Sequence, residues 1–289
     1  TSGIIVRVGA DVKGWKTGDR VGLHHHVPCM ECHFCRHLAF AQCPTYKKTG
    51  ITAGFEPAGG GYAEYVRVMN FCLPGVVKIP SRNSLEEGAM LEPVNTVFKA
   101  VEKLALLPGD RVLVIGQGPI GLMFTRILRL RQMNVAVSDL LPNRLRLALQ
   151  FGAHKALNAD DLRFAAKARR FAPAGFDAVI VAVPVNDAVA QALELVRGAG
   201  KVLLFAHTKR GDAMPIDLSQ VCIDEKDIVG SYSSDFLLQK QVARMVFSRQ
   251  LDVRPLITHR FPMEQTADAI ALASRPAADS LKIITVNQR

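Results

Sequence analysis

Short apolar runs alternate with amphipathic stretches between residues 110 and 234, and this alternation limits the possible folds more than any other feature of the chain. The apolar runs are RVLVIG, NVAVSDL, HKALN, FDAVIVAV, GKVLLFA and DIVGSYS. Between them, residues 120–131, 142–151 and 186–196 carry apolar side chains at three- and four-residue spacing, as amphipathic helices do. Strands that alternate with helices form a parallel sheet covered on both faces. We therefore predict an α/β fold with a doubly wound parallel sheet.

The region before this alternation has a different pattern. Up to about Pro80, β-like runs such as GIIVRVG, RVGLHHHV, GGGYAEYVRV and VVKIP are broken by Gly and Pro. From Ser84 the pattern becomes helical and continues to about Leu107, and Ser84 and Glu87 have the spacing of a capping box. The pattern predicts a loop-rich β module followed by one helix.

The region after the alternation should return to that module. Helices are expected over 236–248 and 263–274, separated by the short strand ITHRF, and LKIITV forms a last strand. We therefore predict two domains. The first is discontinuous and consists of residues 1–95 and 235–289, and the second consists of residues 96–234.

Length and composition agree with a two-domain protein that has no membrane or nucleic-acid partner. The 289 residues are 49% hydrophobic, yet no apolar run approaches the roughly 20 residues of a membrane span. The first residues also lack the basic and apolar segments of a signal peptide, so we expect a cytoplasmic protein. The formal charge of +10 is spread along amphipathic stretches, and no nucleic-acid-binding pattern accompanies it.

The first apolar run ends in a glycine-rich turn. Gly116, Gly118 and Gly121 have G-x-G-x-x-G spacing and stand between a predicted strand and a predicted helix that begins with Pro119 and Ile120. The first glycine permits a tight turn, the second lets the backbone approach a pyrophosphate, and the third lets helix and strand pack closely. Backbone N–H groups at the start of the helix would then face the phosphates, so the turn predicts a dinucleotide cofactor.

An acidic residue follows at the end of the next predicted strand. The carboxylate of Asp139 can accept hydrogen bonds from a ribose hydroxyl and would repel the 2′-phosphate of NADP, which favours NAD. An aspartate at a strand end can also cap the following turn, and that alternative stays open. Arg144 either lies beside the adenosine part of the cofactor or faces water.

Four of the six cysteines fall within one short segment. They have the spacing C-x2-C-x2-C-x7-C, which fits the closed tetrahedral shell of a structural zinc site. An iron–sulfur cluster is the alternative, but the last gap is longer than in ferredoxin patterns. Cys72 and Cys222 lie in apolar surroundings and are expected to be core residues. The predicted ligands are Cys29, Cys32, Cys35 and Cys43.

Together these features resemble the zinc-containing medium-chain dehydrogenase/reductases, which include alcohol, sorbitol and threonine dehydrogenases. The resemblance extends over essentially the whole chain. It rests on the turn KTGDRV, the four-cysteine lobe, GGYAEY, the pair Glu92-Pro93 and the glycine turn. It implies a GroES-like β-rich catalytic domain beside a Rossmann domain that binds NAD. It further implies oxidation of an alcohol or polyol at a secondary alcohol, and assembly into dimers or tetramers.

The resemblance also implies where the site residues lie. In that family a cysteine and a Gly-His-Glu motif hold a catalytic zinc, and both precede the segment GIIVRVG; because the chain begins at Thr1, we expect an upstream segment to carry them and the chain alone to be inactive. Glu92 matches the position of a glutamate close to that zinc, either as a ligand or through its water. Thr96, Val183 and Phe205 would line the nicotinamide pocket.

Because strand side chains alternate, His24 and His26 would share one face and His25 would point to the other. The resemblance implies that His25 faces the substrate. Packing beneath the zinc lobe is an equally good role for this histidine. Two other functions compete with a zinc dehydrogenase. One is a zinc-independent reductase of the same fold, which would not need the four-cysteine lobe. The other is an inactive NAD-binding protein.

Overall fold

The computed structural model describes residues 1–24, 27–48, 61–206, 211 and 213–287. The chain divides into two compact units. Residues Thr1–Thr96 together with Ser233–Arg289 form the first unit, and Val97–Tyr232 form the second unit. Helix α4 (Leu91–Leu104) begins in the first unit and continues into the second.

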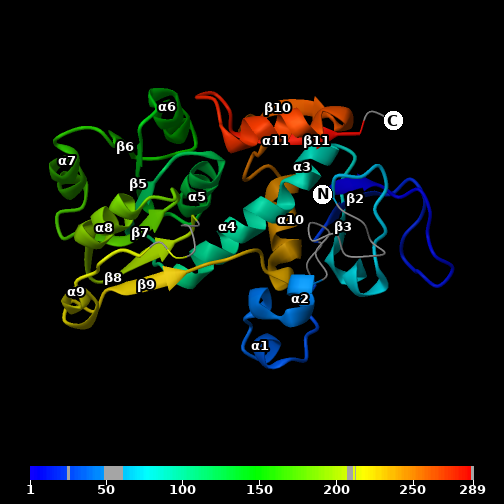
Figure 1. Ribbon diagram of the computed structural model, residues 1–289, viewed down its shortest axis with the longest axis horizontal. Coiled ribbons are helices and arrows are strands. Elements are labelled where there is room, and N and C mark those ends of the chain that lie inside the picture. Colours follow the sequence, from blue (N-terminus) through cyan, green and yellow to red (C-terminus); the bar gives the residue numbers. More distant parts are fainter. Residues whose placement is uncertain (25–26, 49–60, 207–210, 212, 288–289) are drawn as a thin grey trace. The chain divides into compact units, whose positions relative to one another are not determined.

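The second unit is built on a six-stranded parallel sheet with the order β6-β5-β4-β7-β8-β9, which confirms the predicted doubly wound sheet (Figure 1). All six predicted strands are present. They are β4 (Arg111–Ile115), β5 (Asn134–Asp139), β6 (Lys155–Asn158), β7 (Phe176–Val181), β8 (Val196–Leu204) and β9 (Asp227–Gly230).

The helices of the second unit are α5 (Pro119–Leu130), α6 (Pro142–Gln150), α7 (Phe164–Phe171), α8 (Asn186–Leu195) and α9 (Leu218–Cys222). Helices α5, α6 and α8 start and end close to the predicted positions, and α7 and α9 were not predicted by range. Proline occupies the first position of α5 and of α6, where its missing N–H has no partner to lose and its fixed φ suits a helix. Cys222 is exposed at the end of α9, so the prediction that it is a core residue was wrong. Cys72 is half-buried.

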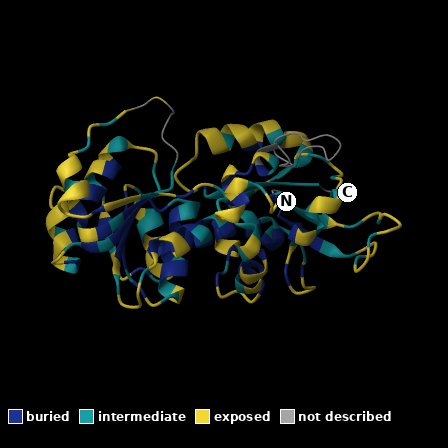
Figure 2. Cartoon of the chain, turned by 90° about the horizontal axis from the view of Figure 1, so that it is seen from below, coloured by how far each residue is buried: buried dark blue, intermediate teal, exposed yellow. Residues whose placement is uncertain are grey.

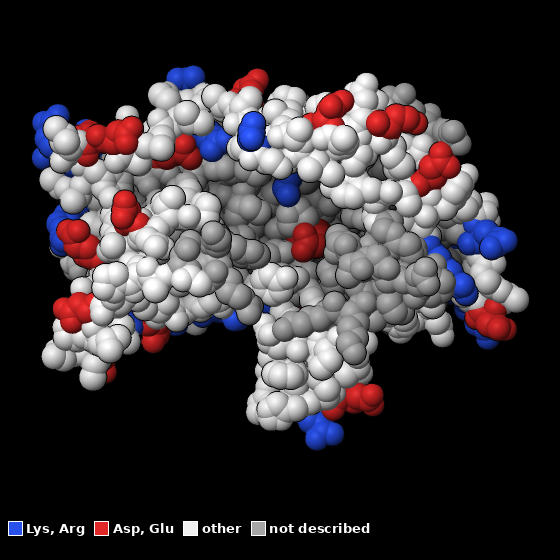
Figure 3. Space-filling view, viewed as in Figure 1, with Lys and Arg blue, Asp and Glu red and all other residues white. Residues whose placement is uncertain are grey.

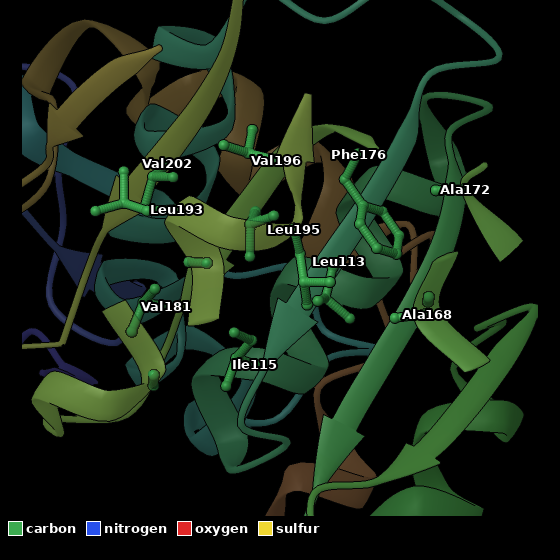
Figure 4. Close-up of a cluster of buried hydrophobic side chains, with 14 of the residues drawn as sticks. Leu113, Ile115, Ala168, Ala172, Phe176, Val181, Leu193, Leu195, Val196 and Val202 are labelled. Carbon is green, nitrogen blue, oxygen red and sulfur yellow. The ribbon is translucent and has the colours of Figure 1, made fainter. Parts of the chain in front are cut away.

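Both faces of this sheet are buried. Leu113 and Ile115 pack with Phe176, Val181 and Leu193 in one cluster, to which α7 and α8 contribute (Figure 4). Because side chains alternate along a strand, Val112 and Val114 point to the other face, and they are fully buried as well. Figure 2 shows this burial: the interior is dark blue, and the outward faces of the helices are yellow, the colour of exposed residues. Burial on both faces explains the continuous apolar runs of the central strands.

The first unit contains an antiparallel sheet of β1 (Ser2–Ile4), β2 (Arg20–Leu23) and β3 (Val76–Lys78), and a parallel pair of β10 (Ile257–Pro262) and β11 (Lys282–Val286). Its longer helices are α10 (Gln239–Phe247) and α11 (Thr266–Ser274). Shorter helices are α1 (His33–Arg36), α2 (Pro44–Lys48) and α3 (Leu85–Ala89). Segments of 3-10 helix occupy Phe40–Gln42, Asn70–Gly75, Phe236–Leu238, Arg254–Leu256 and Met263–Gln265.

The single helix predicted from Ser84 is divided into α3 and α4 at Met90. The capping box is present, since the Ser84 hydroxyl accepts from the Glu87 N–H and the Glu87 carboxylate accepts from the Ser84 N–H. Pro93 explains the division, because it has no N–H to donate to the carbonyl of Ala89 and so cannot continue α3.

Two predicted strands differ from the structure. The first is shorter than GIIVRVG, because regular pairing with β2 ends at Ile4 and only Ile5 adds bonds to the turn that follows. The second, GGGYAEYVRV, forms no strand over its described residues 61–68. Val66 and Val68 instead pack their side chains on the buried Val21 and Leu23 of β2.

The chain crosses from one unit to the other twice, and the two crossing segments are held together in the first unit. The side chain of Asn95 is fully buried; its Oδ1 accepts from the Asp235 N–H at 2.8 Å, and its Nδ2 donates to the Asp235 carbonyl at 2.9 Å. Gln239 Oε1 accepts from the same Nδ2 at 3.2 Å and lies 3.3 Å from Nδ1 of His24. The start of α4 is therefore fixed beside the returning segment.

Candidate functional site

The glycine turn connects β4 to α5, and its three glycines have different surroundings. Gly116 has φ of 91°, a left-handed conformation that favours glycine, and a Cβ there would lie 2.4 Å from Cγ1 of Val183. A Cβ at Gly121 would lie 1.8 Å from the Gly116 carbonyl oxygen. A Cβ at Gly118 would meet nothing within 4 Å. Two glycines are thus needed by the fold, and the third leaves open space at the N-terminus of α5.

That open space is where an anion would bind. Gly118 is the N-cap residue of α5, and Pro119 and Ile120 form its first turn. The N–H groups at a helix start and the favourable end of the helix dipole attract phosphate groups. The residues present therefore fit a dinucleotide, whose pyrophosphate can approach the backbone at Gly118 without meeting a side chain.

Asp139 lies at the end of β5 and is bonded to the glycine turn. Its Oδ2 accepts from the Gln117 N–H at 2.6 Å, and its Oδ1 accepts from the Leu141 N–H at 2.9 Å. The carboxylate is buried to 8% exposure and caps two main-chain segments. A carboxylate has about four lone pairs, so two bonds leave capacity for a ribose hydroxyl. Both readings of Asp139 made from the sequence are therefore compatible, and the two roles can coexist.

The other predicted cofactor residues lie at the same edge of the sheet. Val183 follows β7 and stands beside Gly116, and Phe205 follows β8 with its ring 4.9 Å from that of Phe124, edge to face. Parallel strands bring their carboxyl ends to one edge, which explains why residues far apart in the sequence meet here. Arg144 lies in the first turn of α6 and is half-buried.

Sequence reasoning missed Gln117, the residue between the first two glycines. Its side chain is fully buried, with Nε2 bonded to the Gly116 and Val114 carbonyls and Oε1 accepting from Thr125. A long polar residue between two glycines, directly after an apolar strand, was the signal that could have identified it. A buried amide must find partners inside the fold.

The four predicted zinc ligands come together in a small lobe of the first unit. Their sulfur atoms all lie within 4.8 Å of one another, and the pairs Cys32–Cys35, Cys29–Cys43 and Cys29–Cys35 are 3.5, 3.7 and 3.9 Å apart. Four sulfurs held tetrahedrally at 2.3 Å from one zinc ion would lie about 3.8 Å apart. The geometry therefore fits a single ion better than an iron–sulfur cluster, whose ligands bind different iron atoms. The ligands are Cys29, Cys32, Cys35 and Cys43.

The lobe's local structure and protonation also suit a metal. Met30 takes φ of 65°, which turns the chain back between the first two ligands. Burial raises the pKa of the Cys43 thiol, but backbone N–H groups of Cys29 and Tyr46 outweigh it and lower the pKa to about 6. Burial raises the pKa of the Cys35 thiol to about 12, so a cation is needed to ionise all four sulfurs. The lobe has few apolar residues, and Phe40 and Tyr46 form most of its buried core.

Glu92 lies in the first turn of α4 and is half-buried. The hydroxyl of Thr96, one turn later, can donate to Glu92 Oε1 at 3.1 Å or to its carbonyl at 3.0 Å. Burial lowers the pKa of the Lys282 ammonium group on β11, while the charge of Glu92 raises it. The structure thus places Glu92 near a basic group and Thr96, but among the described residues only the four cysteines gather as three or more metal-binding side chains.

His25, the other predicted catalytic residue, lies outside the described residues, as does His26. Its neighbour His24 is buried to 1% exposure and belongs to the bonded group around Asn95 and Gln239. Both roles expected of His25, facing the substrate or packing beneath the zinc lobe, therefore stay predictions.

The face of the molecule drawn in Figure 3 does not present one dominant charge. Figure 3 shows acidic and basic side chains interspersed over the face in view, with neither sign gathered into one patch. No helix among the described residues combines the length and apolar composition that a membrane span requires.

Comparisons with known proteins agree with these features. Residues 1–81 match the family model of the alcohol dehydrogenase GroES-like domain, and residues 119–248 match that of zinc-binding dehydrogenases. The chain is similar to L-idonate 5-dehydrogenase of Vitis vinifera, with 33% identity over 91% of this chain and 71% of that relative. Sorbitol dehydrogenase of Arabidopsis thaliana is 30% identical over 98% of this chain and 77% of its own length.

Solved structures show the same fold. The alcohol dehydrogenase TADH from Thermus sp. ATN1 has a TM-score of 0.84 and 25% identity, covering 99% of this chain and 82% of that chain. The parallel sheet, the GroES-like match and the four-cysteine lobe occur together in this chain. The chain therefore belongs to the zinc-containing medium-chain dehydrogenase/reductase superfamily, a family of α/β oxidoreductases that use a nicotinamide cofactor.

Proposed function

We propose that this protein is an NAD-dependent dehydrogenase that oxidises a secondary alcohol of a polyol and transfers the hydride to the nicotinamide. The observation that carries the proposal is the open space at Gly118, bounded by two glycines that the fold itself requires. The relatives named sorbitol and L-idonate dehydrogenases support a polyol as substrate.

We assign the cofactor to the second unit and the substrate to the first. The turn Gly116–Gly121 would hold the pyrophosphate, Asp139 the adenosine ribose, and Arg144 the adjacent part of the cofactor. Val183 and Phe205 would border the nicotinamide, because they lie at the carboxyl edge of the sheet. The buried carboxylate of Asp139 would accept hydrogen bonds from the ribose hydroxyls, which favours NAD. The 2′-phosphate of NADP would instead meet the negative charge of this carboxylate.

In the first unit, Glu92 would stand beside the catalytic zinc, Thr96 would contact the nicotinamide or its ribose, and His25 would face the substrate. A zinc ion, when bound there, supplies Lewis-acid chemistry that lowers the pKa of the substrate hydroxyl. Among the described residues, Glu92 is the one that would hold this ion or its water. The four-cysteine lobe would hold a second zinc ion with a closed shell, which stabilises structure.

Titration with NADH and NADPH tests the proposal. We expect NADH fluorescence to change on binding, and NADPH to bind at least about tenfold more weakly because of Asp139. Metal analysis should find one zinc per chain bound by the cysteine lobe. NADH fluorescence that stays unaltered in a folded sample would refute a dehydrogenase. NAD binding without any zinc would instead favour a zinc-independent reductase.

We also propose a cytoplasmic homo-oligomer, a dimer or a tetramer. Apolar side chains are exposed on α9, directly after it and on the edge strand β9, with Leu218 74% exposed, Ile223 79% and Ile228 38%. An open sheet edge flanked by exposed apolar residues is a surface that associates readily. Light scattering tests this proposal, and a monomer at micromolar concentration would contradict it.

A further inference from the structure

We infer that Gln117 is a positioning residue for the cofactor: its buried side chain fixes the main chain of the glycine turn against α5. The inference rests on the proposed dinucleotide site. The hydrogen bonds of Gln117 to Val114, Gly116, Thr125 and Asp139 all lie inside the second unit, so it would act through the backbone of the turn and not by touching the cofactor.

The contacts of Gln117 join three elements. Its main-chain N–H donates to Asp139 at the end of β5 at 2.6 Å. Its side-chain Nε2 donates to the Gly116 carbonyl at 3.0 Å and the Val114 carbonyl at 3.3 Å. Its Oε1 accepts from the Thr125 hydroxyl of α5 at 3.0 Å. Strand β4, strand β5 and helix α5 are therefore linked through one residue.

The crowding around Gly116 explains why this amide matters. The Gly116 carbonyl points at α5 so closely that a Cβ on Gly121 would lie 1.8 Å away. A carbonyl buried in such a gap needs a donor, because an unsatisfied buried polar group is costly. Nε2 of Gln117 supplies that donor. Without it, the turn would relax to bring the carbonyl toward another donor.

Any such relaxation moves the backbone N–H groups at the start of α5, which the pyrophosphate of the cofactor requires. Gly118 follows Gln117 directly and is the N-cap residue of α5. Phosphate binding at a helix start depends on backbone N–H groups that point at the ligand. A preorganised donor binds an anion better than one that must be reoriented on binding. Gln117 and Thr125 therefore set the pyrophosphate affinity, while the adenosine part of the site lies on β5 and α6.

The variant Gln117→Leu tests the inference, since leucine has a similar volume and no amide. ADP and adenosine should be titrated in competition with NADH, because only ADP carries the pyrophosphate. We expect the Kd for ADP to rise by about tenfold and the Kd for adenosine to stay within about twofold. The control is Gln150→Leu, the same chemical change on an exposed residue of α6, which should alter neither Kd.

If Gln117 had a structural role alone, Gln117→Leu would weaken the binding of ADP and of adenosine equally or would change neither. Either result would overturn the inference. Should Gln117→Leu fail to fold, the pair Thr125→Val and Thr125→Ser gives the same test. The valine variant removes the hydroxyl bonded to Oε1 and should lose ADP affinity selectively, whereas serine should restore it. Wild-type protein that binds neither NADH nor ADP would overturn the proposed function, and the inference with it.

Discussion

Alanine at Gly118 and alanine at Gly121 should have opposite effects on the protein. The Gly121→Ala methyl would lie 1.8 Å from the Gly116 carbonyl oxygen and 2.9 Å from its carbon, and both are backbone atoms that cannot rotate away. The Gly118→Ala methyl would meet no protein atom within 4 Å. One variant therefore perturbs the fold, and the other perturbs only the space proposed for the pyrophosphate.

The magnitudes follow from this geometry. A normal contact of about 3.4 Å requires α5 to move away from β4 by well over 1 Å in Gly121→Ala, and overpacking of this kind costs about 1–3 kcal/mol or more. Gly118 has φ of −65°, which alanine adopts without strain, but alanine is a poorer N-cap residue than glycine, so the two effects offset and Gly118→Ala should change the stability by less than about 1 kcal/mol. Its methyl group should weaken NADH binding by about tenfold or more.

Two measurements on each variant test the reasoning: the free energy of unfolding by chemical denaturation, and the Kd for NADH by fluorescence titration. We expect a large loss of stability for Gly121→Ala and a selective loss of affinity for Gly118→Ala. The assignment of the pyrophosphate to this turn is refuted if Gly118→Ala binds NADH as tightly as the wild type. Equal stability of Gly121→Ala and wild type would refute the packing argument.

The remaining predictions concern the metal lobe, the ribose carboxylate and pH. Cys43→Ser should lower the zinc content toward zero, whereas Cys222→Ser, at an exposed cysteine, should leave one zinc per chain; equal zinc in both variants would exclude the lobe as its site. Asp139→Asn should narrow the preference for NADH over NADPH as measured by the ratio of their Kd values, and an unchanged ratio would remove Asp139 from cofactor selection. Burial lowers the pKa of His154, whose Nδ1 accepts from the Val135 N–H. The neutral form is thus favoured in the fold, and the stability it contributes is present above the unfolded value of 6.5 and is lost as the pH falls. In His154→Gln the free energy of unfolding should fall less than in the wild type between about pH 7 and pH 5, the range in which histidine titrates. A fall as steep as that of the wild type would contradict this.

The six strands of the second unit and its helices α5, α6 and α8 could be predicted from the sequence, because they carry the period of their own secondary structure. Both ends of β5 and the start of α5 at Pro119 agree with local signals. The first unit was harder to predict. Residues 61–68 alternate as a strand does, yet pairing depends on a neighbouring strand, which an alternating pattern cannot specify.

The candidate site could be predicted where spacing alone fixes the chemistry. Cysteines two residues apart can reach one ion whatever the rest of the fold does, and the sulfur distances agree with that reasoning. Gln117 could not be predicted in the same way, because its role depends on Thr125 lying on the facing side of α5. The second role of Asp139, as a cap for the Gln117 N–H, likewise depends on the register between β4 and β5.

The bonds between Asn95 and Asp235 have a consequence for the order of assembly. The two parts of the first unit are separated in the sequence by the whole second unit. Bringing the ends of roughly 140 flexible residues together costs about 4 kcal/mol of chain entropy, by its logarithmic dependence on length. A folded second unit removes most of that cost, because Lys99 and Lys103 of α4 already donate to the carbonyls of Tyr232 and Gly230. The first unit thus depends on its insertion for folding, whereas the insertion is one continuous stretch that can fold without its host.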